Sequence, residues 1–311
     1  MRPIPISFLV ILFIFPAVLG QLEFGFYDRT CPPAESIVAT VVSSFSSDRS
    51  ITAALLRMHF HDCFVTGCDA SLLIDSIPGR PSEKDAGPNL SVRGYEIIDE
   101  AKRQLEAKCP ATVSCSDIIA LATRDSVELA GGPTYLVPTG RRDGFTSNPE
   151  VVDLPGPTIP VPASVQLFAD KGLNIDDMVT LIGGGHSVGV ARCSLFQDRL
   201  RDPAMDPSLN FMLRNTCSGP NDPLVFLDQL TPLTVDNGLY IESLRQRAIL
   251  RIDQSLALDV STRAFVLSFA SSNTLFARRF TQAMVKMGTI GVLTGNEGEI
   301  RRSCRVFNRD G

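Results

Sequence analysis

Eight cysteines constrain the fold of this 311-residue chain more than any other feature. All eight follow an N-terminal stretch with Arg2 near its start, an apolar run over 8–15 and a plausible cleavage point after Gly20. This pattern predicts a signal peptide over residues 1–20 and a secreted protein. An even number of cysteines in a secreted chain predicts four disulfides. Spacing alone indicates only one pair, because Cys63 and Cys68 flank Gly67 in a stretch that can close as a tight loop.

The composition excludes several classes of protein. Hydrophobic residues at 44% and charged residues at 20% fit a compact globular chain, not a disordered one. The formal charge of -5, which becomes -6 if Arg2 leaves with the signal peptide, argues against nucleic acid as the main partner. The apolar run is too short to cross a bilayer and no second run follows, so we expect no membrane anchor.

Apolar periodicity predicts a mainly helical protein with Gly/Pro-rich connections and few short strands. The expected helices cover 50–64, 95–108, 116–130, 164–171, 176–182, 186–200, 236–249 and 261–287, the last in two pieces. We expect Gly183-Gly184-Gly185 to interrupt the helical pattern. A long irregular connection over 138–162 predicts a division into two halves.

The chain has three histidines, His59, His61 and His186, which limits where proton transfer near neutral pH can occur. In a helix, Arg57 and His61 share one face, whereas His59 lies about 200° round from His61. We therefore predict that His61 is a catalytic base and that His59 is a structural histidine with its hydrogen bonds satisfied. The Arg57 guanidinium disfavours imidazolium, which keeps His61 neutral, and it can stabilise developing negative charge.

A set of oxygen ligands follows these residues directly. The side chains of Asp62, Asp69 and Ser71 and the carbonyls of Val65 and Gly67 lie within ten residues. Such a set is typical of calcium, although the spacing is not that of an EF-hand. The alternative is that these aspartates only form turns. A zinc site is less favoured, because no Cys-x-x-Cys pair is present.

Four segments carry a resemblance to a known family: Arg57–Phe64, Gly183–Gly189, Gly140–Asp143 and Val113–Asp117. Together with the order of the cysteines, they resemble the plant secretory (class III) haem peroxidases, the class of horseradish peroxidase. The resemblance covers about residues 22–305. It implies one domain over 21–311, with a distal half of about 21–150 and a proximal half of about 151–290 that enclose a haem. It also implies a C-terminal segment tied back by Cys304 and the disulfides Cys31–Cys109, Cys63–Cys68, Cys115–Cys304 and Cys193–Cys217.

The resemblance also assigns roles to individual residues. Arg57, His61 and Asn89 would be catalytic, with the Asn89 side chain accepting a hydrogen bond from His61. His186 would be the axial haem ligand, and Asp253 would accept its other ring N–H. The implied cofactors are one haem b and two Ca²⁺ per chain. The remaining residues implied are Pro155 at the phenol entrance, the distal calcium ligands Asp62, Val65, Gly67, Asp69, Ser71 and Glu83, and the proximal calcium ligands Ser187, Asp228, Thr231, Thr234 and Asp236.

The function that the resemblance implies is an extracellular enzyme of the apoplast or cell wall. It would reduce hydrogen peroxide through an oxo-ferryl intermediate and oxidise small phenolic donors, including lignin precursors, one electron at a time, also under oxidative stress. We expect a monomer. The main alternative is a catalytically weak secreted haem protein with a structural role in the wall. A secreted hydrolase is disfavoured because no Gly-x-Ser-x-Gly motif is present, and an intracellular ascorbate-type peroxidase because of the signal peptide and eight cysteines.

The sequence departs from the family pattern in two segments. After Asn89 the chain is one residue shorter than usual, which makes Asn89-Leu90-Ser91 a glycosylation sequon. We expect it to stay unmodified, because a distal asparagine would be buried. The segment from Cys193 to Cys217 is also shorter than in many relatives, so we expect a more open haem edge and an altered preference for donors.

Overall fold

The computed structural model describes residues 21–309, so the predicted signal peptide lies outside the described part. The mainly helical prediction is confirmed, and two short strands form the one sheet of this part of the chain. The α-helices are α1 (Ala34–Ser44), α2 (Ile51–Phe64), α3 (Tyr95–Lys108), α4 (Cys115–Leu129), α5 (Val161–Asp170), α6 (Ile175–His186), α7 (Pro207–Cys217), α8 (Gly238–Leu244), α9 (Arg251–Leu258), α10 (Arg263–Ser271) and α11 (Asn273–Met287). Short 3-10 helices are η1 (Ser71–Leu73), η2 (Glu83–Asp85), η3 (Gly87–Asn89), η4 (Pro149–Val151), η5 (Cys193–Phe196) and η6 (Arg199–Arg201).

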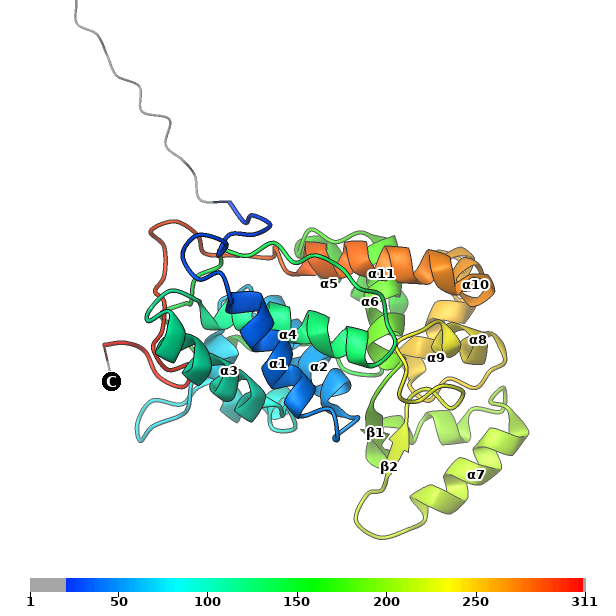
Figure 1. Cartoon of the computed structure of the whole chain (residues 1–311). Coiled ribbons are helices and arrows are strands. Elements are labelled where there is room, and N and C mark those ends of the chain that lie inside the picture. Colours follow the sequence, from blue (N-terminus) through cyan, green and yellow to red (C-terminus); the bar gives the residue numbers. More distant parts are fainter. Residues whose placement is uncertain (1–20, 310–311) are drawn as a thin grey trace, which may run out of the picture.

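Helices α1 to α4 form the first half of the molecule (Figure 1). Helix α4 packs against both α1 and α2, and α3 covers α1 and α4 from the other side. The Ser114 side chain caps α4 by accepting a hydrogen bond from the Asp117 amide. Helix α2 buries residues on all sides, which fits a central helix and places its polar side chains inside the molecule.

The predicted interruption of helix α6 is wrong. The helix runs from Ile175 through the three glycines to His186. A Cβ atom on Gly183 would lie 2.3 Å from the ring of Tyr240, and one on Gly184 would lie 2.4 Å from the ring of Phe280. The glycines therefore permit close packing against α8 and α11, and this packing outweighs their low helix propensity.

The predicted helix over 186–200 is also wrong. After His186 the chain turns at Gly189, which has φ +96°, and forms strand β1 (Val190–Arg192). This strand pairs antiparallel with β2 (Leu224–Phe226), with Ala191 opposite Val225. The left-handed glycine conformation ends the helical path, and the strand pairing supplies backbone partners that a helix would otherwise provide.

The helix predicted over 236–249 is shorter than expected. Helix α8 ends at Leu244, and Gln246 adopts φ +62°, so a new helix, α9, starts at Arg251. The sequence reading also missed α1, α7 and α9. Helix α7 had a readable signal, because Asp206 caps it and Pro207 occupies its first turn.

The four disulfides that the resemblance implies are all present, and the described residues contain no free cysteine. The bond between Cys115 and Cys304 joins residues 189 positions apart and ties the C-terminal segment to α4. This segment runs back beside α3 (Figure 1), where Arg305 forms an ion pair with Asp99 at 2.6 Å. No helix within residues 21–309 has the length and apolar character needed to cross a membrane.

Candidate functional site

Arg57, His61 and Asn89 form a hydrogen-bonded chain. Arg57 and His61 lie one turn apart in α2, and the Arg57 Nε donates to His61 Nε2 at 3.1 Å. The other ring nitrogen, His61 Nδ1, lies 2.6 Å from Asn89 Oδ1. Because an amide oxygen only accepts hydrogen bonds, Nδ1 carries the proton. The lone pair of His61 is therefore on Nε2, the nitrogen that Arg57 contacts.

The segment from Glu83 to Ser91 positions both catalytic candidates. The Asn89 amide nitrogen donates to the Glu83 carbonyl at 2.7 Å, which fixes the orientation of the amide. Arg57 donates through Nη1 to Ser91 Oγ at 3.0 Å and through Nη2 to the Pro88 carbonyl at 2.8 Å. Sequence reasoning missed Pro88 and Ser91. A carbonyl contact leaves no sequence signal, and the signal that Ser91 carries is that of the glycosylation sequon.

The electrostatics of this group favour a neutral base. The pKa of His61 is lowered to about 4, mainly by burial and then by the charge of Arg57. The hydrogen bond to Asn89 raises the pKa, but by less than Arg57 lowers it. The imidazole is thus neutral at mildly acidic pH. A neutral imidazole with a fixed Nδ1–H can accept a proton at Nε2 and later return it.

His186 and Asp253 form a second pair, at the end of α6 and on α9. His186 Nδ1 lies 2.8 Å from Asp253 Oδ1. Burial lowers the pKa of His186, but the charge of Asp253 and its hydrogen bond together raise the pKa above the ordinary value. The charge of Arg57 acts on His186 in the opposite direction, so the two groups lie within electrostatic range of each other. With Nδ1 bonded to Asp253, Nε2 is the ring nitrogen left for a ligand.

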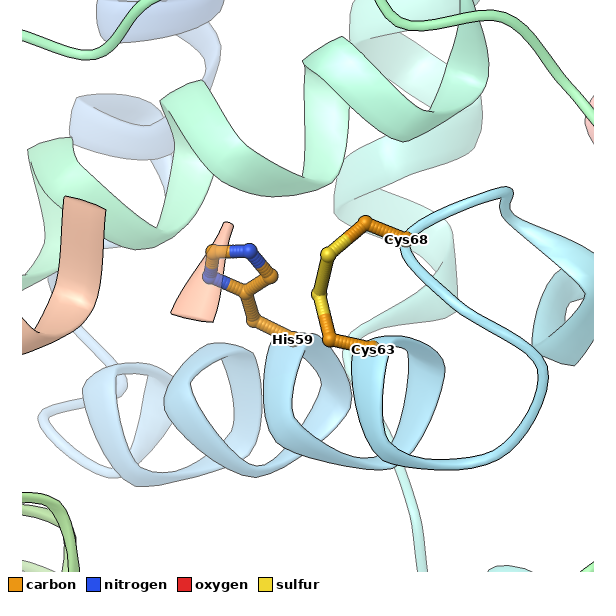
Figure 2. A group of neighbouring side chains, drawn as sticks. All are labelled: His59, Cys63 and Cys68. Atoms are coloured by element: carbon orange, nitrogen blue, oxygen red, sulfur yellow. A yellow bond between two sulfur atoms is a disulfide. The ribbon is translucent and has the colours of Figure 1, made fainter. Parts of the chain in front are cut away.

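His59 is buried, as the sequence predicted, but the predicted satisfaction of its hydrogen bonds is wrong. Neither ring nitrogen has a hydrogen-bond partner within residues 21–309. The ring lies beside the Cys63–Cys68 disulfide (Figure 2). Burial lowers the pKa of His59 to about 3, so it is a neutral packing residue. Because both sulfurs are in the disulfide, this group has no thiolates for a metal.

The predicted distal calcium ligands cluster around the loop after α2. Both carboxylate oxygens of Asp62 and of Glu83 are buried without hydrogen-bond partners among the described residues. Burial raises the pKa of Asp62 well above its usual range and that of Glu83 to about 7, and the neighbouring Asp69 carboxylate adds to both effects. Buried carboxylates without partners fit a hard cation such as Ca²⁺. The Val65 and Gly67 carbonyls belong to the same loop, and Asp69 Oδ1 accepts from the Ser71 amide at 3.0 Å.

Three of the predicted proximal calcium ligands also converge. The Thr231 hydroxyl lies 2.9 Å from Asp236 Oδ1 and 3.3 Å from Asp228 Oδ2. A Cβ atom on Gly238 would come within 2.4 Å of Asp228 Oδ2 and 2.5 Å of Thr231 Oγ1, so only glycine leaves these oxygens their space. The bridge between Val188 and Leu233 brings the predicted ligands Ser187 and Thr234 towards this segment, although the Ser187 hydroxyl donates to the Gly184 carbonyl. This donor set fits a hard cation.

Comparison with known proteins decides the family. A family model described as Peroxidase matches residues 37–272. This chain belongs to the peroxidase family. The peroxidase is 70% identical to Peroxidase 44 of Arabidopsis thaliana over 309 residues, covering 99% of this chain and all of the relative. It is 55% identical to Peroxidase 28 and to Peroxidase 57 of the same plant, covering 96% and 97% of this chain and 97% of each relative.

Membership implies a haem cofactor, and the residues of this peroxidase fit one. His186 offers a ring nitrogen, supported by Asp253, and the Arg57–His61 pair lies close enough for the charge of Arg57 to act on His186. The Pro157 carbonyl accepts a hydrogen bond from the Ile252 amide at 3.0 Å, which places the segment that contains Pro155 next to α9.

Proposed function

We propose that this peroxidase reduces hydrogen peroxide with Arg57, His61 and Asn89 as its catalytic residues and oxidises small phenolic donors. One observation carries the proposal: the hydrogen-bonded chain from Glu83 through Asn89 to His61 leaves the His61 lone pair on Nε2, beside the Arg57 guanidinium. A base in a fixed tautomer next to a permanent cation is suited to splitting the bond between two oxygens heterolytically, because it can move a proton from one oxygen to the other and stabilise the charge that separates.

Haem bound through His186 would supply the iron that accepts electrons from a donor and passes them to peroxide. His61 Nε2 would take a proton from one peroxide oxygen and deliver it to the other, which would leave as water. Arg57 would stabilise the negative charge that develops as the two oxygens separate. Asp253 would hold the Nδ1 proton of His186 and make the imidazole more electron-rich.

The hydrogen bond between Arg57 Nε and His61 Nε2 has a consequence for this sequence of steps. The Arg57 N–H and a proton from the substrate would bind to the same lone pair on His61 Nε2, so the hydrogen bond must open before His61 can accept a proton. The Ser91 hydroxyl and the Pro88 carbonyl hold the far end of the guanidinium. Arg57 can therefore turn at Nε while these contacts keep its charge near the substrate.

The proposal also covers cofactors, processing and organisation, on the basis of the resemblance and of the geometry of the cation sites. The chain would be a monomer that binds one haem and two Ca²⁺. It would lose a signal peptide over residues 1–20, be secreted to the cell wall, and consist of a distal half of about 21–150 and a proximal half of about 151–290. Buried carboxylates without partners support the distal calcium, and the convergence of Asp228, Thr231 and Asp236 supports the proximal one. The shorter segment between Cys193 and Cys217 makes donor preference the part of the function most specific to this chain.

A visible absorption spectrum of the purified protein tests the proposal. We expect a Soret band that changes on addition of one equivalent of hydrogen peroxide and returns on addition of guaiacol. A haem band that does not respond to peroxide would favour the catalytically weak haem protein. Absence of any haem band after reconstitution with haem and calcium would refute the proposal.

A further inference from the structure

Lys171 contacts the distal cation loop from a different part of the chain. It follows the last residue of α5, and its Nζ donates to the Val65 carbonyl at 2.9 Å. Val65 is the first residue after α2 and opens the loop that carries the distal oxygen ligands. No carboxylate within residues 21–309 forms an ion pair with Lys171. Among the described residues, the one direct partner of the ammonium group is thus the Val65 carbonyl, which is a predicted calcium ligand.

A second cation already lies beside this site. Arg301 is fully buried and donates through Nη1 to the Ala70 carbonyl at 2.7 Å, within the same loop. Arg301 has several anionic neighbours: the carboxylates of Asp62, Asp69, Glu83 and Asp143 lie within its electrostatic range, and Glu299 Oε1 lies 3.8 Å from its Nε. The charge of Arg301 is therefore balanced by carboxylates, whereas Lys171 has no carboxylate partner among the described residues, so its charge would add to that of a bound Ca²⁺.

We infer that Lys171 is a tethered cation that weakens calcium binding at the distal site and speeds calcium release. The inference rests on the distal calcium site of the proposed function. The hydrogen bond from Lys171 to Val65 exists without calcium, so it contributes little to the difference between the free and bound states. Repulsion between the ammonium and the ion exists only in the bound state. With the Lys171 Nζ atom 2.9 Å from the Val65 oxygen and an oxygen–calcium distance of about 2.4 Å, the two charges would lie at most about 5.3 Å apart, too close for salt to screen fully.

The contact also links calcium exchange to the catalytic residues. Glu83, a predicted member of the distal calcium shell, supplies the carbonyl that fixes Asn89, which in turn fixes His61. Lys171 keeps hold of Val65 when the ion leaves, so one end of the loop stays anchored to α5. The distal site is in this way suited to exchange calcium with its surroundings instead of holding it permanently.

The test compares Lys171→Met, which removes the charge at similar length, with Lys171→Arg, which keeps it. The full mature protein is depleted of calcium with a chelator and titrated with Ca²⁺ by calorimetry at low ionic strength. Circular dichroism verifies that each variant is folded. We expect Lys171→Met to bind the distal Ca²⁺ about tenfold more tightly and Lys171→Arg to bind like the wild type. The difference should shrink as KCl is added. Equal or weaker binding by Lys171→Met would overturn the inference.

A double variant tests whether Lys171 acts at the distal calcium site and not at the proximal one. Asp62→Asn weakens the distal site, so adding Lys171→Met in this background should leave the remaining, proximal binding unchanged. A persisting effect would overturn the inference, because Lys171 would then act elsewhere. A wild-type protein that binds no Ca²⁺ would refute the proposed calcium sites themselves. Calcium binding that is indifferent to Lys171 would refute only the role of Lys171.

Discussion

The Nδ1 atom of His61 lies 2.6 Å from the Oδ1 atom of Asn89, and the Asn89 amide nitrogen lies 2.7 Å from the Glu83 carbonyl oxygen. This relationship decides which nitrogen of His61 can act as a base. It also joins the catalytic group to the predicted distal calcium shell through a single side chain.

Replacement of Asn89 by valine should slow the reaction with hydrogen peroxide. The His61 Nδ1–H would lose its acceptor, and the tautomer with the lone pair on Nε2 would no longer be favoured. We expect about a hundredfold lower rate constant for peroxide, measured by stopped-flow absorbance, at the lower end of typical general-base contributions. Leu90→Ala is the control, because Leu90 is 73% exposed and lies in the same loop. An unchanged rate for Asn89→Val would show that Asn89 does not orient His61.

The sequon at Asn89 should carry no glycan. The Asn89 side chain is buried, and both its oxygen and its nitrogen are in hydrogen bonds, so the folded protein offers no free amide for a sugar. The intact mass of the protein secreted from a plant host, before and after treatment with a glycan-releasing amidase, checks this. A mass loss on treatment would contradict the assignment of Asn89 to the catalytic chain.

The rate of reaction with peroxide should fall in acid with an apparent pKa near the value of about 4 that burial and Arg57 give His61. His61 is the neutral base above this pH and is protonated below it. Arg57→Gln removes a positive charge, so the pKa of His61 should rise, while burial keeps it below its ordinary value of 6.5. The acid limb of the pH–rate profile should therefore move to higher pH. An acid limb that stays in place would exclude His61 as the titrating group.

Calcium removal should destabilise the protein more at pH 7.5 than at pH 5. Burial raises the pKa of Glu83 to about 7 in the protein without an ion, so folding favours the protonated carboxyl. This contribution is present below the ordinary value of 4.5 and is lost as the pH rises through about 7. Bound Ca²⁺ would pair the ionised carboxylate and reduce this loss. Melting temperatures with Ca²⁺ and with chelator at both pH values test the effect, and Glu83→Gln should diminish it.

The glycines of α6 should differ in their tolerance of alanine. Gly183→Ala would place a methyl group 2.3 Å from the Tyr240 ring, and overpacking of this kind costs about 1–3 kcal/mol. Gly185→Ala meets no atom within 4 Å, and it should raise the helix stability by up to about 1 kcal/mol. Denaturant unfolding of the two variants makes the comparison. Equal stabilities would contradict the close packing of α6 against α8.

Sequence reasoning located the features that depend on local pattern. Helix α3 has the predicted bounds because its apolar positions repeat with helical spacing and Cys109-Pro110 ends it. Arg57 and His61 were placed together because both lie on one helix face. The course of α6 was mispredicted because helix propensity says nothing of the Tyr240 and Phe280 rings, which come from distant segments. The contacts of Pro88 and Lys171 were missed because they involve backbone carbonyls, which every residue carries.

The bond between Cys115 and Cys304 has a consequence for the order in which the protein is made. Helix α4 belongs to the first half, but its partner cysteine leaves the ribosome nearly two hundred residues later, at a separation of 189. The hydrogen-bond partners of Arg141 and Asp143 are likewise synthesised much later: Arg141 Nε donates to the Gly288 carbonyl, and Asp143 accepts from the Arg301 amide. The half of the molecule that is synthesised first therefore cannot complete its interior until residues 288–304 have been made, and a truncation that removes them should destabilise the N-terminal half before it destabilises the other.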